Sequence, residues 1–342
     1  MQGPSITRFL KSALRGKAAH AAVRRHQHYY VDEGSGEAVR RSDAAELNRN
    51  YYDLVTDIYE YAWGPSFHFA ARRRAESFPD SIVRHELYLA ERAGLNAEMK
   101  VLDLGCGIGG PMRNIGRATG AHIIGVNNNA YQVQRGLALN AEAGLVDRLE
   151  FIECDWMHMP VEPGTFDAAY SVESSCIAGD RVALFREVHR VLKDGAPFVG
   201  YEYCLTERYD PSNAQHRRDK AAIEQGAGLP ALVGQREIED AIRRGGFELM
   251  ECRDLAPECD AETPWYLPLK GEGMSVQALR RSHMGGLTLQ FAVSVLERVG
   301  VLPRGARAVI RMLRRCGDAM VRTGAAGVFT PMLFFEARKA PR

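Results

Sequence analysis

Short apolar runs alternate with amphipathic stretches through the middle of the chain, from residue 99 to about residue 255. The apolar runs have the length of buried strands, and the stretches between them have the period of helices. Strands that alternate with helices favour an α/β fold with a doubly wound, mostly parallel sheet. The expected strands are 101–104, 122–126, 149–153, 166–172, 197–203 and 247–253, and two of the expected helices are 181–192 and 235–245.

Helical patterns also flank this core, at about 44–62 and 80–94 before it and near 274–299 and 305–322 after it. A last apolar run, 330–337, predicts a strand, and the polar residues 32–44 predict a linker. We therefore expect three parts along the chain. They are a basic segment that is flexible or lies on a membrane surface (1–43), a core with N-terminal helices (44–255), and a C-terminal α+β extension (256–342).

The composition narrows the classes of function. The 342 residues carry 44 Lys and Arg against 43 Asp and Glu, so the overall charge does not favour binding to nucleic acid. The seven cysteines form no C-x-x-C pair, which indicates reduced thiols in an intracellular compartment and predicts no metal site. No apolar run has the length of a membrane span.

The first thirty residues are biased toward positive charge. Six Lys and Arg residues precede the first acidic residue, Asp32, and several apolar residues between Ile6 and Leu14 fall on one helical face. This pattern is typical of a helix on a membrane surface or of a transit peptide, and equally of a solvated basic tail. The three interpretations stay open.

A glycine-rich turn gives the strongest chemical signal. The run from Val101 to Gly110 reads as a buried strand that ends in a turn and opens into a helix. Glycines at such a turn let the backbone approach a ligand closely, and the first turn of the helix offers unpaired N–H groups. Gly105, Gly107 and Gly110 fit the G-x-G-x-x-G pattern, so we expect a nucleotide-like cofactor at this turn.

The residues around the turn indicate which cofactor this is. A dinucleotide site expects an acidic residue about twenty positions later, where this chain has Asn127-Asn128-Asn129. Asp103, two residues before the turn, suits a cationic amine instead. At the end of the third expected strand, Asp155 is suited to an adenine amine and Trp156 to ring stacking, and the fourth expected strand ends at Glu173. Across roughly residues 95–250 this set resembles the S-adenosylmethionine-dependent methyltransferases of the Rossmann-like class.

An aromatic and acidic block precedes this core: Tyr59-Glu60-Tyr61-Ala62-Trp63-Gly64. At helical spacing Tyr52, Tyr59 and Trp63 share one face. Such a face stabilises a desolvated cation by about 2 kcal/mol or more, although aromatic stripes more often belong to a hydrophobic core. The block therefore predicts either a cage for positive charge or a packing surface.

Several blocks in the same order resemble the sterol 24-C-methyltransferases, over roughly residues 45–340. The blocks are Tyr59 to Gly64, Gly105 to Pro111, Asn127 to Asn129, Tyr201-Glu202-Tyr203, Pro264-Trp265-Tyr266 and Thr330-Pro331-Met332. This resemblance implies transfer of a methyl group from S-adenosylmethionine to the side-chain alkene at carbon 24 of a sterol, through a carbocation. It also implies peripheral contact with a membrane (the endoplasmic reticulum in a eukaryote), and it leaves homo-oligomerisation open.

The resemblance also assigns roles to residues. It implies that Tyr59, Tyr61 and Trp63 face the cation, and that Glu60 and Glu173 stabilise charge or remove a proton. His85 is a weaker candidate base. Each of these residues also has a simpler interpretation. Glu60 fits a helix cap or an ion pair, and Glu173 fits contact with the cofactor alone. His85 and His68 fit histidines with a purely structural role. The residues expected to bind the cofactor are Tyr52, Asp103, Gly105, Gly107, Gly110, Asn127, Asn128, Gln132, Asp155, Trp156 and Glu173.

Three positions depart from the family pattern. Ala62 stands where Gly is usual, Ala130 where an acidic residue is common, and Ile177 where the pattern has His. These departures are compatible with binding of the cofactor and keep alternative acceptors open. The alternatives are a methyltransferase for a linear triterpene or an unsaturated acyl chain, a nicotinamide-dependent oxidoreductase, and a non-catalytic lipid-binding module.

Overall fold

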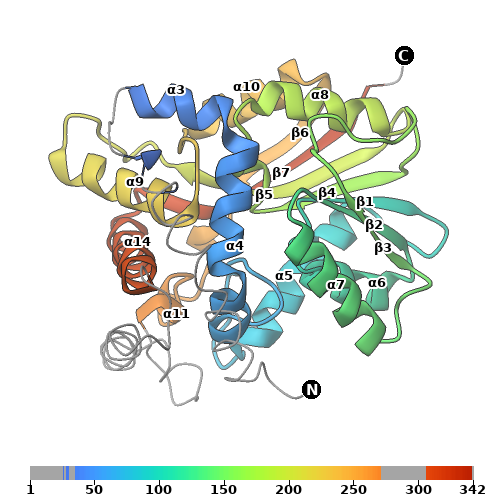
Figure 1. Cartoon of the computed structure of the whole chain (residues 1–342), viewed down its shortest axis with the longest axis horizontal. Helices are drawn as coiled ribbons and strands as arrows, with labels where there is room; N and C mark the ends of the chain where they lie inside the picture. Colours follow the sequence, from blue (N-terminus) through green and yellow to red (C-terminus); the bar gives the residue numbers. More distant parts are fainter. Residues whose placement is uncertain (1–25, 27, 31–34, 271–305, 341–342) are drawn as a thin grey trace. The chain divides into compact units, whose positions relative to one another are not determined.

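The largest element of the computed structural model is a seven-stranded sheet with the strand order β3-β2-β1-β4-β5-β7-β6 (Figure 1). The neighbours from β3 to β5 pair in parallel, whereas β7 runs antiparallel to β6. This arrangement confirms the predicted α/β fold with a doubly wound, mostly parallel sheet. The strands are β1 (Lys100–Leu104), β2 (His122–Asn127), β3 (Leu149–Glu153), β4 (Ala168–Val172), β5 (Pro197–Leu205), β6 (Phe247–Asp254) and β7 (Phe329–Lys339).

The structure describes residue 26 and residues 28–30, 35–270 and 306–340. Two of the predicted features, the basic amphipathic stretch between Ile6 and Arg25 and the helix at 274–299, lie outside these residues.

The described chain divides into two compact units whose segments alternate along the sequence. We call the first the helical unit (Met1–Phe67, Arg208–Ala231 and Tyr266–Phe329) and the second the sheet unit (His68–Glu207, Leu232–Trp265 and Thr330–Arg342). This division differs from the three consecutive parts expected from the sequence, because each unit is built from distant segments of the chain.

Helices cover both faces of the sheet in the sheet unit. In Figure 1, α8 and α10 lie on one face, and α5, α6 and α7 lie on the other. The helix starts follow local signals, since Ser77, Asn129 and Asp180 each accept a backbone N–H as the N-cap of the next helix. The bounds are α5 (Phe78–Arg92), α6 (Gly110–Thr119), α7 (Ala130–Glu142), α8 (Arg181–Val191) and α10 (Gln235–Arg244), with short 3₁₀ turns η1 (Ser175–Ile177) and η2 (Ala256–Glu258).

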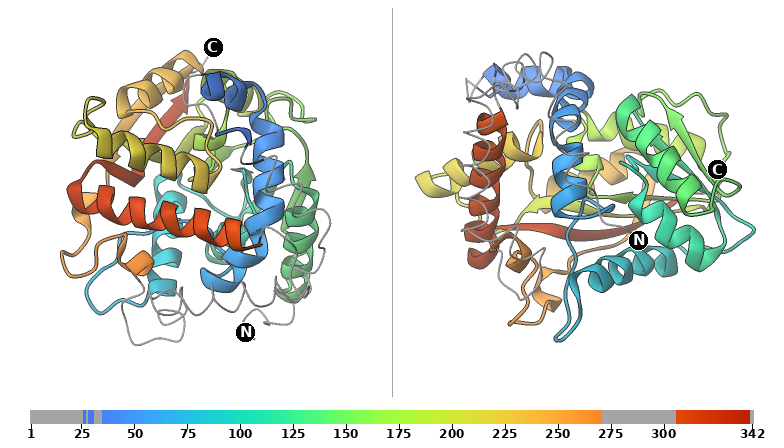
Figure 2. Two further views of the ribbon diagram at one scale, coloured as in Figure 1. Left: turned by 60° about the vertical axis from the view of Figure 1, so that its left-hand side comes forward. Right: turned by 60° about the horizontal axis from the view of Figure 1, so that its bottom comes forward.

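The helical unit contains α3 (Ser35–Ser42), α4 (Ala44–Ala62), α9 (Ala214–Ala227), α11 (Leu267–Lys270) and α14 (Ala306–Ala326). Helices α9 and α14 lie side by side in both views of Figure 2. Gly226 allows this close approach, because a Cβ atom there would lie 2.2 Å from the Cβ of Cys316.

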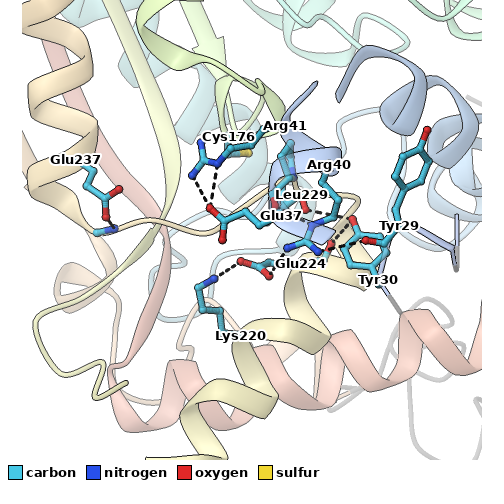
Figure 3. A network of polar contacts seen from close by, with 12 residues as sticks. Tyr29, Tyr30, Glu37, Arg40, Arg41, Cys176, Lys220, Glu224, Leu229 and Glu237 are labelled. Atoms are coloured by element: carbon cyan, nitrogen blue, oxygen red, sulfur yellow. Dashed lines mark hydrogen bonds and ion pairs between the residues drawn. The ribbon is translucent and has the colours of Figure 1, made fainter. Parts of the chain in front are cut away.

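Residues 35–42 form a helix where the polar composition predicted a linker, so that prediction was wrong. This helix is stabilised by contacts with distant parts of the chain (Figure 3). The buried Arg40 side chain donates hydrogen bonds to the carbonyl oxygens of Pro230 at 2.9 Å and Tyr29 at 3.3 Å, and it pairs with Glu224 at 3.5 Å. These partners are far from α3 in the sequence, so local composition does not reveal them.

All seven cysteines belong to the described residues and are free thiols. Among the described residues, no cluster of His, Cys, Asp and Glu has the geometry of a metal site. None of the described helices is long and apolar enough to cross a bilayer.

Candidate active site

The turn between β1 and α6 is built from glycines in the left-handed backbone region. Gly105 has a φ of 74° and Gly107 a φ of 54°. A Cβ atom on Gly105 would lie 2.6 Å from the Cβ of Ser174 and 2.8 Å from the ring of Trp156, so only glycine fits there. A Cβ atom on Gly107 would have no atom within 4 Å, which leaves open space beside this part of the turn. Gly110, also predicted, is the first residue of α6.

Asp103 lies on β1 directly before this turn and is 2% exposed. Its carboxylate accepts a hydrogen bond of 2.9 Å from the hydroxyl of Tyr170 on β4. Burial raises the pKa of Asp103 to about 7, although the Tyr170 hydrogen bond opposes this rise. A cationic amine beside this carboxylate would favour its ionised form, so the site fits the amino group of S-adenosylmethionine better than a pyrophosphate.

Asn127 links the end of β2 to the glycine turn. Its Nδ2 donates to the Gly107 carbonyl at 3.0 Å and to Oε1 of Gln132 at 2.8 Å, and its Oδ1 accepts the N–H of Asn129 at 2.9 Å. The structure therefore brings three predicted cofactor residues together. The half-exposed Asn128 lies next to them, and Asn129 caps α7, a role that the sequence analysis did not assign.

Asp155 and Trp156 follow β3, which pairs with β2 at the same edge of the sheet. Asp155 is exposed and accepts the N–H of Met157 at 3.0 Å. Trp156 is half-buried and packs against the core cluster of the sheet unit, next to the space that a Cβ atom on Gly105 would occupy. Both residues lie at the carboxyl ends of the strands, where open α/β sheets bind their ligands.

Glu173 follows β4 and combines burial with an unusual backbone. It is 8% exposed and has a φ of 51°, a region that residues other than glycine rarely adopt. Its Oε1 accepts the N–H of Phe69 at 2.8 Å, whereas its Oε2 has no hydrogen-bond partner among the described residues. Burial raises the pKa of Glu173 to about 8, and the imidazole of His68, the Phe69 N–H and the Tyr203 hydroxyl partly oppose this rise.

His85 lies in the interior of the sheet unit. Its ring stacks on Tyr201 of β5 with a centroid distance of 3.8 Å, and burial lowers its pKa well below the ordinary value. The Tyr201 hydroxyl donates to the backbone carbonyl of His85 at 3.0 Å. This packing favours the structural alternative for His85, and its role as a base stays a prediction.

The remaining predicted site residues belong to the helical unit and cluster near the end of α4. Tyr51 donates its hydroxyl to the Gly226 carbonyl at 2.6 Å, so the Tyr59 hydroxyl, 2.5 Å away, donates to the Tyr51 oxygen. The Tyr59 ring also packs edge-on against Phe67 at 5.6 Å. Glu60 is buried, whereas Tyr52, Tyr61 and Trp63 are half-buried.

The structure also shows polar residues that sequence reasoning did not connect to the site. The carboxylate of Glu86, on α5, bonds to both His68 and Asn114 in the interior of the sheet unit. These three residues belong to no motif in the sequence. The only local signal was the position of His68 between two phenylalanines, which also fits a structural histidine.

Comparison with known proteins decides the family. Residues 101–195 match the family model described as "Methyltransferase domain", and residues 276–341 match "Sterol methyltransferase C-terminal". The chain is 42% identical over 334 residues to cycloartenol-C-24-methyltransferase 1 of Oryza sativa subsp. japonica, covering 96% of each chain. The chain belongs to the sterol 24-C-methyltransferase family.

A second relative agrees with this assignment, and a solved structure shares the fold. Sterol 24-C-methyltransferase ERG6 of Saccharomyces cerevisiae is 40% identical over 307 residues, which cover 88% of this chain and 80% of that protein. The cyclopropane synthase MmaA2 of Mycobacterium tuberculosis has a similar fold, with a TM-score of 0.67, 16% identity, and coverage of 86% of this chain and 98% of that one. The predicted family, enzyme class and cofactor are therefore confirmed: this chain is an S-adenosylmethionine-dependent methyltransferase, which excludes the nicotinamide alternative.

Proposed function

We propose that this member of the sterol 24-C-methyltransferase family transfers the methyl group of S-adenosylmethionine to carbon 24 of a sterol side chain. The observation that carries the proposal is the 42% identity to a cycloartenol-C-24-methyltransferase over 96% of both chains. The match at residues 276–341 extends the similarity beyond the cofactor-binding region. A relative of this kind supports a sterol as the methyl acceptor as well as S-adenosylmethionine as the methyl donor.

The proposed reaction is an electrophilic alkylation. The π electrons of the side-chain alkene form a bond to the methyl carbon while the methyl–sulfur bond breaks, which leaves S-adenosylhomocysteine and a carbocation. A hydride shift and loss of a proton to a base then restore an alkene. The protein must align the alkene with the methyl group, exclude water and stabilise the positive charge.

Within this proposal, Tyr59, Tyr61 and Trp63 face the cation. The hydrogen bond from Tyr59 to the buried Tyr51 supports this role for Tyr59, because it restrains one aromatic ring of the block. Glu60 and Glu173 stabilise the charge or accept the proton. Oε2 of Glu173 is buried and has no hydrogen-bond partner among the residues that the structure describes, which supports Glu173 more strongly than Glu60.

For the cofactor, we propose that the open side of the glycine turn and the carboxyl ends of β1 to β4 hold S-adenosylmethionine. Asp103 pairs with its amino group, and the first turn of α6 offers N–H groups. The other residues in this proposal are Tyr52, Gly105, Gly107, Gly110, Asn127, Asn128, Gln132, Asp155, Trp156 and Glu173.

A sterol acceptor resides in membranes, so we further propose peripheral contact with a membrane, the endoplasmic reticulum in a eukaryotic cell. Vesicle co-sedimentation tests this contact. Homo-oligomerisation stays a prediction that light scattering of the purified protein tests.

The reaction is tested by mass spectrometry of lipid products. Purified protein is incubated with S-adenosylmethionine that carries a deuterated methyl group and with a panel of Δ24 sterols, squalene and unsaturated phospholipids. We expect label at carbon 24 of at least one sterol, and none in a reaction without protein. Label only in squalene or in an acyl chain would replace the sterol proposal with the alternative acceptor, and no label in any lipid would refute the catalytic proposal.

A further inference from the structure

His68, the first residue of the sheet unit, is buried with both ring nitrogens facing oxygen acceptors. Its Nδ1 lies 2.7 Å from the backbone carbonyl oxygen of Phe69, and its Nε2 lies 3.0 Å from Oε1 of Glu86. A carbonyl oxygen only accepts hydrogen bonds, so Nδ1 must carry a hydrogen. The charge state of His68 therefore depends on Glu86.

Glu86, on α5, is fully buried, and its second oxygen also has a partner. Oε2 accepts a hydrogen bond of 2.6 Å from Nδ2 of Asn114 on α6. An amide N–H₂ is a donor, so Oε2 of Glu86 accepts, and Oε1 is left to pair with Nε2 of His68. With Glu86 as a carboxylate, Nε2 of His68 donates as well, and His68 is then an imidazolium ion.

The peptide groups of Phe69 connect this ion pair to Glu173. The Phe69 carbonyl accepts the hydrogen bond from His68, and the Phe69 N–H donates to Oε1 of Glu173 at 2.8 Å. The Phe69 ring packs edge-on against Trp265 with a centroid distance of 5.0 Å. Because Phe69 is held at its N–H, carbonyl and ring, His68 fixes the donor that orients Glu173.

The charges around His68 agree with this geometry. Burial alone lowers the pKa of His68, but the hydrogen bond and charge of Glu86, together with the charge of Glu173, outweigh burial and raise it. The other titratable groups that interact with the pair are Asp103 on β1, Tyr170 on β4, and His85 on α5, whose ring centroid is 6.0 Å from that of His68. Glu202 on β5 interacts with Glu173. His85 stays neutral because burial and the charge of His68 lower its pKa.

We infer that His68 is a protonated positioning residue, whose ion pair with Glu86 holds the Phe69 peptide against Glu173 and favours the ionised form of the Glu173 carboxylate. The inference about catalysis rests on the proposed function, whereas the charge of His68 does not. His68 acts through Phe69 and Glu173 and needs no contact with the substrate. The positive charge of His68 also opposes the rise in pKa that burial causes at Asp103 and Glu173.

Two uncharged variants test the two hydrogen bonds of His68 one at a time. In His68→Asn the amide nitrogen replaces Nδ1, and in His68→Gln it replaces Nε2. We expect both to lower kcat about tenfold or more, with the KM for the sterol changed less than about threefold. We also expect the acidic limb of the pH–kcat profile to move upward by about one unit, since Glu173 loses a nearby positive charge.

His28→Gln is the matched control, because it makes the same substitution at an exposed histidine. It should leave kcat and the pH profile unchanged. Melting temperatures of all variants are measured to separate misfolding from a catalytic effect. A folded His68→Gln variant with the kcat and pH profile of the unmodified protein would overturn the positioning role.

The charge of His68 is tested without any assay of activity. In protein labelled with ¹⁵N-histidine, we expect one buried histidine to show two protonated ring nitrogens at pH 7, and Glu86→Gln to abolish this signal. A neutral His68 at pH 7 would overturn the inference even if sterols are methylated. An imidazolium signal in a protein that methylates no lipid would instead refute the proposed function, so the two failures are distinguishable.

Discussion

At the scale of single residues, Glu173 combines three features that cost stability. Its backbone lies in the left-handed region, its side chain is buried, and Oε2 has no hydrogen-bond partner among the described residues. Strain and unsatisfied buried oxygens of this kind concentrate at functional sites. The position of Glu173 after β4 therefore supports a role in binding or catalysis rather than in folding.

We predict that Glu173→Gln lowers kcat by about 10²-fold, because an amide lacks the negative charge that favours the developing cation. The melting temperature should stay equal or rise, since the variant removes a buried carboxyl whose pKa burial raises to about 8. Glu162→Gln is the control, because Glu162 is exposed. Single-turnover assays and thermal unfolding check both effects, and unchanged turnover would remove Glu173 from the site.

At the scale of elements, the connection from β1 to α6 depends on how closely the turn approaches its neighbours. Gly105 has no room for a side chain because Ser174 and Trp156 lie beside it. Ser174 also donates a hydrogen bond to the carbonyl of Leu104, the last residue of β1, which ties the loop after β4 to the glycine turn. The turn and this loop therefore form one packed edge of the sheet.

Replacement of Gly105 by Ala should destabilise the protein by about 2–4 kcal/mol, from backbone strain and from displacement of Ser174 and Trp156. It should also weaken binding of S-adenosylhomocysteine. Gly164→Ala is a matched control, because Gly164 has a φ of 68° but its Cβ atom would meet nothing within 4 Å. This control should cost only about 1–2 kcal/mol of strain and leave binding intact. Denaturation measures the loss of stability and calorimetry the loss of ligand affinity. If the two variants lost equal amounts of both, the packing argument would be contradicted.

At the scale of the whole molecule, buried acids give the ligand-free protein an unusual dependence on pH. Burial raises the pKa of Glu173 to about 8, and those of Asp103 and Glu202 to about 7. Between about pH 6.5 and 8 the folded state thus retains protons that the unfolded state has lost. The raised pKa of His68 acts in the same direction, whereas the lowered pKa values of His26 and His85 reduce stability only at lower pH.

We therefore predict that the free energy of unfolding of the ligand-free protein decreases from about pH 6.5 to pH 8, by up to about 1.4 kcal/mol per pH unit for each retained proton. Saturating S-adenosylhomocysteine should reduce this slope, because its amino cation favours ionised Asp103. Denaturant titrations at several pH values, with and without the ligand, measure both slopes. Stability that rises with pH in this range would contradict the assignment of the three carboxyl groups.

The sequence predicted most of the sheet because its signals are local. The strand expected at 149–153 is β3, and the strand expected at 122–126 is β2 with one residue added. Helix α3 was missed, because its stability depends on Arg40 reaching Pro230 and Glu224. Helix α9 received no prediction either, since its sequence is largely polar and its buried face is narrow.

By itself, the sequence determined the family, the cofactor class and the position of the glycine turn, since these depend on contiguous motifs whose spacing the covalent chain preserves. Only the tertiary structure decided which buried polar groups meet. His68 and Glu86 are 18 positions apart, Phe69 and Glu173 are 104 apart, and Tyr51 and Gly226 are 175 apart. Hydrogen bonds and charge states depend on distance and burial in space, and packing brings these partners together without any local pattern in the sequence.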